Sequence, residues 1–170
     1  MVFISYSHDS DAVCDSVLEL ANYLRSCGVD AIIDQYEESP LEGWPRWMES
    51  QIRSAEFVLV VSTPNYQEKA TLRVHSDTGL GVKWETNLIL NQLYSTGATT
   101  NKFTPVVLTD SDVQSILVPL QGQTYYNVSH LPRRDALRNR LLGIKETKKP
   151  PLGSLFQKRK SSRSQTHGCW

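Results

Sequence analysis

Long apolar runs and paired cysteines, which mark membrane proteins and secreted proteins, are both missing from this sequence. No stretch of its 170 residues approaches the ~20 apolar residues that a membrane span requires. The N-terminus carries no basic-then-apolar leader. The three cysteines are an odd number and lack the spacing of metal ligands. We therefore expect a cytoplasmic protein with reduced thiols and no membrane span.

Several common catalytic and ligand-binding motifs are missing as well. There is no G-x-G-x-x-G after the first apolar run and no G-x-x-x-x-G-K-[ST], so neither the dinucleotide-binding nor the P-loop fingerprint applies. The absence of C-x-x-C and H-E-x-x-H argues against a metal site. No G-x-S-x-G turn presents a serine nucleophile. We expect neither a metal nor a bound cofactor.

The charges are balanced overall but unevenly distributed. Lys and Arg number 18, as do Asp and Glu. Residues 145–170 hold seven of the basic residues and a single acid, Glu146, so residues 1–144 carry a net charge of minus six. An acidic body argues against nucleic-acid binding. The sequence predicts a domain over 1–144 and a basic, Ser-rich, disordered tail over 145–170.

Apolar runs alternate with helical patterns along the domain. The predicted strands are 2–6, 29–34, 56–62, 102–108 and 123–128, with the third at the sheet centre. The predicted helices are 11–26, one that starts at 44, 82–94 and 132–142. This alternation predicts an α/β fold of the flavodoxin type. We expect a three-layer sandwich whose five-stranded parallel sheet has the order 2-1-3-4-5, with helices on both faces.

Three local features carry their own predictions. The polar segment Thr63–Gly81 has three Gly or Pro breakers and is interpreted as a long loop. Pro105 lacks a backbone donor, which indicates a bulge or a strand at the sheet edge. One apolar stripe is expected to be buried on the helix that starts at 44, and it consists of Trp44, Met48, Ile52 and Ala55.

The segment that follows the first strand is the first place to expect a ligand. Ligands of open α/β sheets gather at the carboxyl ends of the strands. Ser7 and His8 lie at that end. His8 can be a plain loop histidine or a ligand contact, and the pattern alone does not choose between them. Asp9 and Asp11 favour the start of the next helix as caps, where their charge suits the helix dipole.

Four segments, in order, carry a resemblance to a known family. They are FISYSHDSD at 3–11, IIDQYEESPLEGW at 32–44, FVLVVSTPNYQEKA at 57–70 and GVKWETNLIL at 81–90. Over about residues 1–144 the chain resembles the Toll/interleukin receptor (TIR) superfamily, in particular the bacterial-type members of its SEFIR branch. Each motif is loose, but four at the right spacing make the match specific. The fold of that superfamily is the flavodoxin-like one predicted above.

The resemblance implies two possible functions. Some TIR-type domains are interaction modules that dock on like domains through the loop after strand two, here Gln35–Gly43. The interface residues implied in that loop are Glu37, Glu38, Pro40 and Glu42. Other TIR-type domains cleave NAD⁺ with one glutamate on the third helix, which Glu85 matches by position. The substrate-binding residues implied for this chain are Tyr6, Ser7, His8, Asp34, Trp44 and Trp84.

The chemistry of NAD⁺ cleavage makes a single carboxylate sufficient. Breaking the nicotinamide–ribose bond develops an oxocarbenium-like cation while a good leaving group departs, so a fixed carboxylate is needed more than a strong acid. Two departures concern the substrate contacts. Many catalytic relatives carry tryptophan where this chain has Gly81, and some carry basic residues where it has Ser7 and His8. NAD⁺ is expected as substrate, with no cofactor.

We therefore expect a self-associating NAD⁺ glycohydrolase, with a non-catalytic signalling adaptor of the same fold as the alternative. A receiver domain of the response-regulator kind is a third, more distant possibility. The sequence lacks the acidic pair that a receiver carries after its first strand and the lysine after its last strand.

Overall fold

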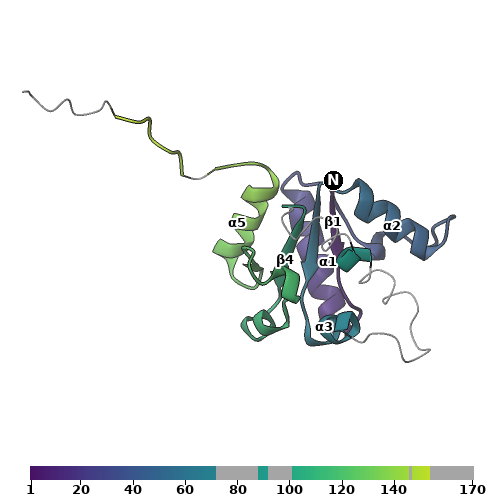
Figure 1. Ribbon diagram of the computed structural model, residues 1–170. Helices are drawn as coiled ribbons and strands as arrows, with labels where there is room; N and C mark the ends of the chain where they lie inside the picture. Colours follow the sequence, from purple (N-terminus) through teal and green to yellow (C-terminus); the bar gives the residue numbers. More distant parts are fainter. Residues whose placement is uncertain (72–87, 92–100, 146, 154–170) are drawn as a thin grey trace, which may run out of the picture.

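The computed structural model describes residues 1–71, 88–91, 101–145 and 147–153. Figure 1 shows a sheet with helices on both sides. The strands are β1 Val2–Ser5, β2 Ala31–Ile32, β3 Phe57–Val61, β4 Phe103–Val107 and β5 Tyr126–Asn127. They form one parallel sheet of the order β2-β1-β3-β4-β5. The predicted topology, with the third strand at the centre, is confirmed.

The helices and the short 3₁₀ turns lie between these strands, except for the helix that follows β5. The helices are α1 Asp11–Ser26, α2 Trp44–Ser54, α3 Pro64–Thr71 and α5 Leu131–Leu141. The 3₁₀ turns are η1 Asp34–Tyr36, η2 Asp110–Ser115 and η3 Val118–Leu120. Residues 88–91 are helical. They lie inside the predicted helix 82–94, whose other residues are outside the described ranges.

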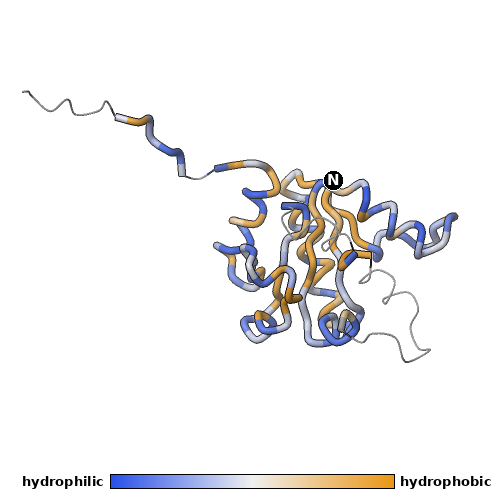
Figure 2. The backbone as a smooth tube through the Cα atoms, viewed as in Figure 1, coloured by the Kyte–Doolittle hydropathy of each residue, from blue (hydrophilic) through white to orange (hydrophobic). Residues whose placement is uncertain are grey.

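Alternation along β1 divides the interior into two cores, one on each face of the sheet. Val2, Ile4 and Tyr6 pack with the buried face of α1 and with Leu137 of α5. Phe3 points to the other face and packs with α2, α3 and η3. The apolar strands occupy the middle of the molecule in Figure 2, with polar residues outside them. This arrangement is the predicted three-layer sandwich.

The predicted loop Thr63–Gly81 is wrong in its first part, because Pro64–Thr71 forms α3. Thr63 begins this helix, since its Oγ1 accepts from the Tyr66 N–H at 3.2 Å and its carbonyl accepts from the Gln67 N–H. The Tyr66 side chain is fully buried. Its hydroxyl lies 2.9 Å from Ser5 Oγ. A single capping threonine and one buried aromatic therefore convert a polar segment into a helix.

The stripe predicted for α2 is wrong at its first member. Trp44 is 41% exposed and Trp47 is buried instead, together with Ile52 and Ala55. The ring of Trp47 packs edge-on against Phe3, with ring centroids 6.0 Å apart. Trp44 stands at the first residue of the helix. Among the described aromatic rings it packs only with that of Trp47, with centroids 5.7 Å apart and planes inclined by 80°.

The edge or bulge predicted from Pro105 is also wrong. β4 lies between β3 and β5, and Pro105 pairs with Val60 in an unbroken register. β4 is hydrogen-bonded to both neighbouring strands. The Ser62 N–H donates to the Val106 carbonyl on the β3 side, and the Val128 N–H donates to the Val107 carbonyl on the β5 side. A parallel strand loses only one donor to a proline. The neighbouring pairs are sufficient to hold this strand inside the sheet.

Candidate functional site

The carboxyl ends of β1 and β2 bring together four of the residues singled out from the sequence. Tyr6, Ser7 and His8 follow β1 directly, and Asp34 opens η1 two residues after β2. β1 and β2 are parallel neighbours, with Val2 beside Ala31 and Phe3 beside Ile32. Their carboxyl ends therefore meet at one edge of the sheet, as predicted for ligand contacts.

His8 and Asp34 form the central contact of this cluster. His8 Nε2 lies 2.7 Å from Asp34 Oδ2. The imidazole also lies against the Tyr6 ring, with centroids 4.9 Å apart and planes inclined by 31°. The His8 side chain is 58% exposed, whereas that of Asp34 is 14% exposed. The imidazole is therefore the solvent-facing part of a pair whose carboxylate is held inside.

The buried phenol of Tyr6 holds the Asp34 carboxylate in place. Burial of the phenol raises its pKa well above the ordinary value, and the hydrogen bond to Asp34 and the charge of Asp34 raise it further. Tyr6 is therefore a neutral hydrogen-bond donor to Asp34 at any physiological pH. Gln35 Nε2 donates to the Tyr6 hydroxyl at 2.8 Å. Asp34 Oδ1 is buried and has no hydrogen-bond donor among the described residues.

A second polar network fixes the segment after β1 to α3. The Ser7 hydroxyl is completely buried and accepts from the Lys69 ammonium. Lys69 Nζ also lies 3.5 Å from Asp9 Oδ1. Thr63 Oγ1 donates to Asp9 Oδ2 at 2.5 Å. Ser7 therefore supports the loop from inside, where a ligand does not reach its hydroxyl directly.

The sequence did not point to Lys69 or Thr63, and it assigned Asp9 a different role. Ser10 is the actual N-cap of α1, since its side chain accepts from the Val13 N–H. Asp9 turns instead toward α3. One signal was available, because Ser10 is a good cap one residue before the helix and leaves Asp9 without a capping function. Lys69 and Ser7 lie 62 residues apart in the chain, so no local sequence pattern could have predicted their contact.

An open groove of about 510 Å³ lies beside this network, at the carboxyl ends of β1, β3 and β4. Asp9, Thr63 and Asn65 line one side of it, and Thr109 and Asp112 line the other. Thr109 and Asp112 are occupied with each other in a capping box at the start of η2. The groove therefore offers polar atoms that are mostly engaged within the protein.

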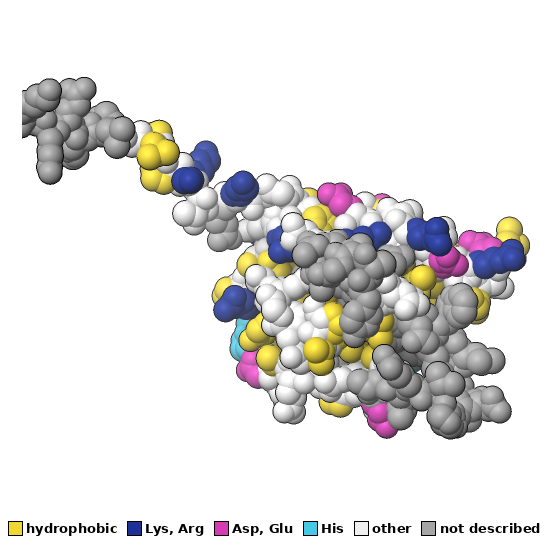
Figure 3. Space-filling view, viewed as in Figure 1, with side chains coloured by type: hydrophobic (Ala, Val, Ile, Leu, Met, Phe, Trp, Pro, Cys, Tyr) yellow, Lys and Arg dark blue, Asp and Glu magenta, His cyan; other side chains and the backbone are white. Residues whose placement is uncertain are grey.

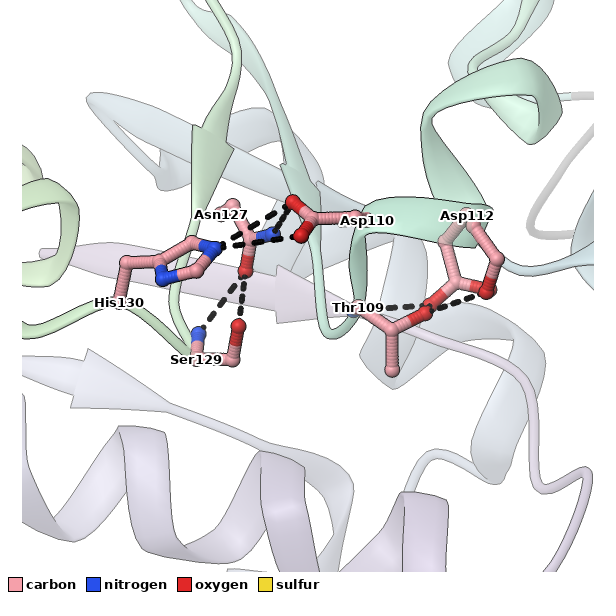
Figure 4. Close-up of polar contacts among 7 residues, drawn as sticks. Thr109, Asp110, Asp112, Asn127, Ser129 and His130 are labelled. Atoms are coloured by element: carbon pink, nitrogen blue, oxygen red, sulfur yellow. Dashed lines mark hydrogen bonds and ion pairs between the residues drawn. The ribbon is translucent and has the colours of Figure 1, made fainter.

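Figure 4 shows a further polar cluster at the ends of β4 and β5. Asn127 Nδ2 donates to Asp110 Oδ1 at 2.7 Å, and His130 Nε2 lies 3.3 Å from the same oxygen. The Ser129 N–H and hydroxyl both donate to Asn127 Oδ1. Asn127 is buried, and both its amide nitrogen and its amide oxygen are hydrogen-bonded. The cluster ties the loop before η2 to the loop before α5.

The loop predicted as an interface protrudes beyond α2. Leu41 is fully exposed, and Tyr36 and Trp44 are each 41% exposed on either side of it. Glu38 and Glu42 are exposed, whereas Glu37 is half-buried and its Oε1 accepts from the Ser39 N–H. Figure 3 shows acidic, basic and hydrophobic side chains close together at this end of the molecule.

The backbone of this loop folds back on itself. The Gly43 N–H donates to the Pro40 carbonyl at 2.9 Å. Gly43 has a φ of +79°, a conformation that L side chains adopt at a cost. This turn sets Leu41 at the tip of the loop.

Comparison with known proteins identifies the family. The family model of the TIR domain matches residues 2–142. The chain belongs to the TIR domain family. It is similar to the crystal structure of a prokaryotic SEFIR domain, with 29% sequence identity and a TM-score of 0.62. That alignment covers 82% of this chain and 96% of the SEFIR chain. No curated protein matches the sequence.

The family match confirms the resemblance and the fold, while the roles assigned to the site residues stay predictions. Trp84 and Glu85 lie outside the described ranges, as do residues 154–170 of the predicted tail. Residues 147–153 carry no helix or strand. Within the described ranges, no group of three or more His, Cys, Asp or Glu side chains is placed to hold a metal ion. None of the helices described there has the length and apolarity needed to cross a bilayer.

Proposed function

We propose that this TIR domain associates with copies of itself and cleaves NAD⁺ at the nicotinamide–ribose bond. The observation that supports this proposal is the Tyr6–His8–Asp34 cluster, in which a held carboxylate and an exposed imidazole meet at the carboxyl ends of β1 and β2. This is the edge where ligands bind in open α/β sheets. The Asp34 side chain is 14% exposed beside His8, and its carboxylate can accept from a ribose hydroxyl.

The reaction assigns Glu85 the charge-stabilising role. The bond between ribose C1′ and the nicotinamide nitrogen breaks, and its electron pair leaves with neutral nicotinamide. A water oxygen then bonds to C1′ and releases a proton. A fixed carboxylate beside C1′ stabilises the cation that develops between these steps, and no strong acid is needed. In this proposal Glu85 takes that position, which it matches by resemblance to the TIR family, and the adjacent Trp84 contacts the substrate.

The described residues receive binding roles in this proposal. Asp34, positioned by Tyr6, accepts from a hydroxyl of the substrate. His8 contacts the nucleotide from the solvent side, and Ser7 holds the loop that carries it. Trp44 presents an exposed ring on which a base can stack. The proposal locates the reaction in the cytoplasm, where NAD⁺ is available and free thiols such as Cys14 and Cys27 stay reduced.

The test is nicotinamide release by concentrated protein incubated with NAD⁺, comparing Asp34→Asn with Asp30→Asn. Asp34→Asn should lower kcat/KM by about tenfold or more, the scale of hydrogen bonds to charged groups. Asp30 is 61% exposed and pairs with Arg25, so Asp30→Asn should match the wild type. Equal activities of the two variants would remove Asp34 from the site. No release by the wild type at any concentration would overturn the enzymatic proposal.

A second candidate is a signalling adaptor without catalysis. TIR domains generally interact with like domains. The observation that favours this candidate is the fully exposed Leu41, flanked by Tyr36 and Trp44 and by the acids of the same loop. An exposed apolar tip with charged neighbours is typical of a protein contact. Self-association without nicotinamide release would favour the adaptor over the enzyme.

A further inference from the structure

A groove of about 380 Å³ lies between α1 and α5, on the side of the sheet opposite α2 and α3. Its lining consists of Ser16, Glu19, Leu20, Leu108, Val128, Ser129, Leu131 and Arg134. We propose that this groove binds a small organic carboxylate with an apolar body, which pairs with the guanidinium of Arg134. The proposal is independent of NAD⁺ cleavage and uses none of the residues assigned to it.

Arg134 is the lining residue whose positive charge favours binding of an anion. Its guanidinium is fixed over the ring of Tyr23, with Cζ 4.2 Å from the ring centroid. The side chain is only 21% exposed. Its Nε is buried and has no hydrogen-bond acceptor among the residues that the structure describes. A guanidinium carries five donors and is always charged, so a half-buried one with an unpaired Nε is incompletely satisfied.

Glu19 satisfies Arg134 poorly. Arg134 Nη1 lies 3.4 Å from Glu19 Oε1, at the long end of a hydrogen bond. The Glu19 side chain is 77% exposed, so water screens the pair and the acid is free to move aside. A carboxylate inside the groove can replace it with two parallel bonds to the guanidinium, the arrangement that this planar fork favours.

The rest of the lining favours a carboxylate with an apolar body over a phosphate. Leu20, Leu108, Val128 and Leu131 supply the apolar part of a lining that is otherwise polar. The two serines offer no free hydroxyl proton, since Ser16 Oγ donates to the Ala12 carbonyl and Ser129 Oγ donates to Asn127 Oδ1. A phosphate dianion would find one guanidinium and no further side-chain donor in the lining. A monoanion that needs a single fork and apolar contact fits this composition.

The test is binding of hexanoate to the full chain, measured by calorimetry and by NMR chemical-shift changes. The matched probes are 1-hexanol, hexylammonium and inorganic phosphate. Hexanoate should bind saturably, and the three other probes should bind at least about tenfold more weakly, because each lacks either the charge or the apolar body. Equal binding of 1-hexanol would leave only a hydrophobic groove and overturn the proposal. Stronger binding of phosphate would also overturn it, as would absence of saturable hexanoate binding.

Two variants are expected to change the affinity for hexanoate in opposite directions. Arg134→Gln should weaken hexanoate binding by about tenfold or more, and Glu19→Gln should strengthen it by removing the competing carboxylate. Arg133→Gln, which changes an exposed neighbour, should leave it within about twofold. Should Arg134→Gln fail to fold, Leu131→Glu replaces it, since it adds a negative charge at an exposed lining position. Unchanged hexanoate affinity in both Glu19→Gln and the weakening variant would refute the assignment.

Discussion

His8 Nε2 lies 2.7 Å from Asp34 Oδ2 although 26 residues separate them in the chain. The contact exists because β1 and β2 are parallel neighbours, and it joins the segments that follow them. Tyr6 holds the carboxylate from inside, so the imidazole is presented to solvent in a fixed orientation. This preorganised group is the part of the structure on which the functional proposal rests.

The state of Tyr6 gives a prediction in the alkaline range. Burial and Asp34 raise the pKa of Tyr6 in the folded protein above the value of about 10 for an unfolded chain. The stability supplied by the neutral phenol is therefore present below pH ~10 and is lost as the pH rises beyond it. Tyr6→Phe should lose less unfolding free energy than the wild type between pH 9 and 11, measured by urea denaturation. Identical pH dependence in both proteins would contradict the protonated, buried phenol.

The link between α3 and the loop after β1 predicts a cost for removing Lys69. Lys69→Met leaves Asp9, whose side chain is 9% exposed, without its cation and Ser7 without a donor. The unfolding free energy should fall by about 1–3 kcal/mol, the cost of unsatisfied buried polar groups. Arg46→Met removes an exposed cation on α2 and serves as the control, with a change below about 0.5 kcal/mol. Equal values for the two variants would mean that water replaces Lys69.

The two tryptophans of α2 should differ sharply when truncated. Trp47→Ala removes a ring that is 7% exposed and packed on Phe3, so it should cost about 3–5 kcal/mol. Trp44→Ala removes a ring that is 41% exposed and should cost about 1 kcal/mol or less. Chemical denaturation of both variants measures the difference. A larger loss for Trp44→Ala would reinstate the stripe predicted from the sequence.

The sheet order and the meeting of Tyr6, Ser7, His8 and Asp34 were predictable because both follow from strand alternation. Parallel strands joined by helices place all their carboxyl ends at one edge, whatever the details of each strand. β2 and β5 are each two residues long, shorter than predicted, yet their positions in the strand order are as predicted. Information that repeats along the chain was therefore sufficient for the fold.

Features that depend on one tertiary contact could not be predicted. α3 forms because Tyr66 has a buried site to fill, and the surrounding sequence is polar. Trp47 is buried rather than Trp44 because Phe3 lies beneath it. Asp9 contacts Thr63 and Lys69, each more than fifty residues away in the chain. The local sequence pattern favoured a loop at α3, a buried Trp44 and a helix-capping Asp9. In each case a contact with a residue distant in the sequence produced a different structure.

The loop Gln35–Gly43 gives a prediction about assembly. Glu37→Lys with Glu38→Lys reverses charge beside the exposed Leu41, so self-association should weaken while the thermal midpoint stays nearly unchanged. Leu41→Ser should act in the same direction by removing the apolar tip. The control is Glu56→Lys, an exposed acid next to the amino end of β3. Oligomers of unchanged size in light scattering would exclude this loop as the interface.

The central claim is tested most directly by nicotinamide release from NAD⁺ in the wild type, Glu85→Gln and Glu68→Gln. Glu85→Gln keeps the size of the side chain and removes the charge to which the proposal assigns stabilisation of the developing cation. Release should fall by about a hundredfold or more, the scale for losing one preorganised stabilising group. Glu68, an exposed acid on α3, provides the matched control, and Glu68→Gln should release nicotinamide at the wild-type rate. Wild-type release by Glu85→Gln, or none by concentrated wild-type protein, would contradict the account.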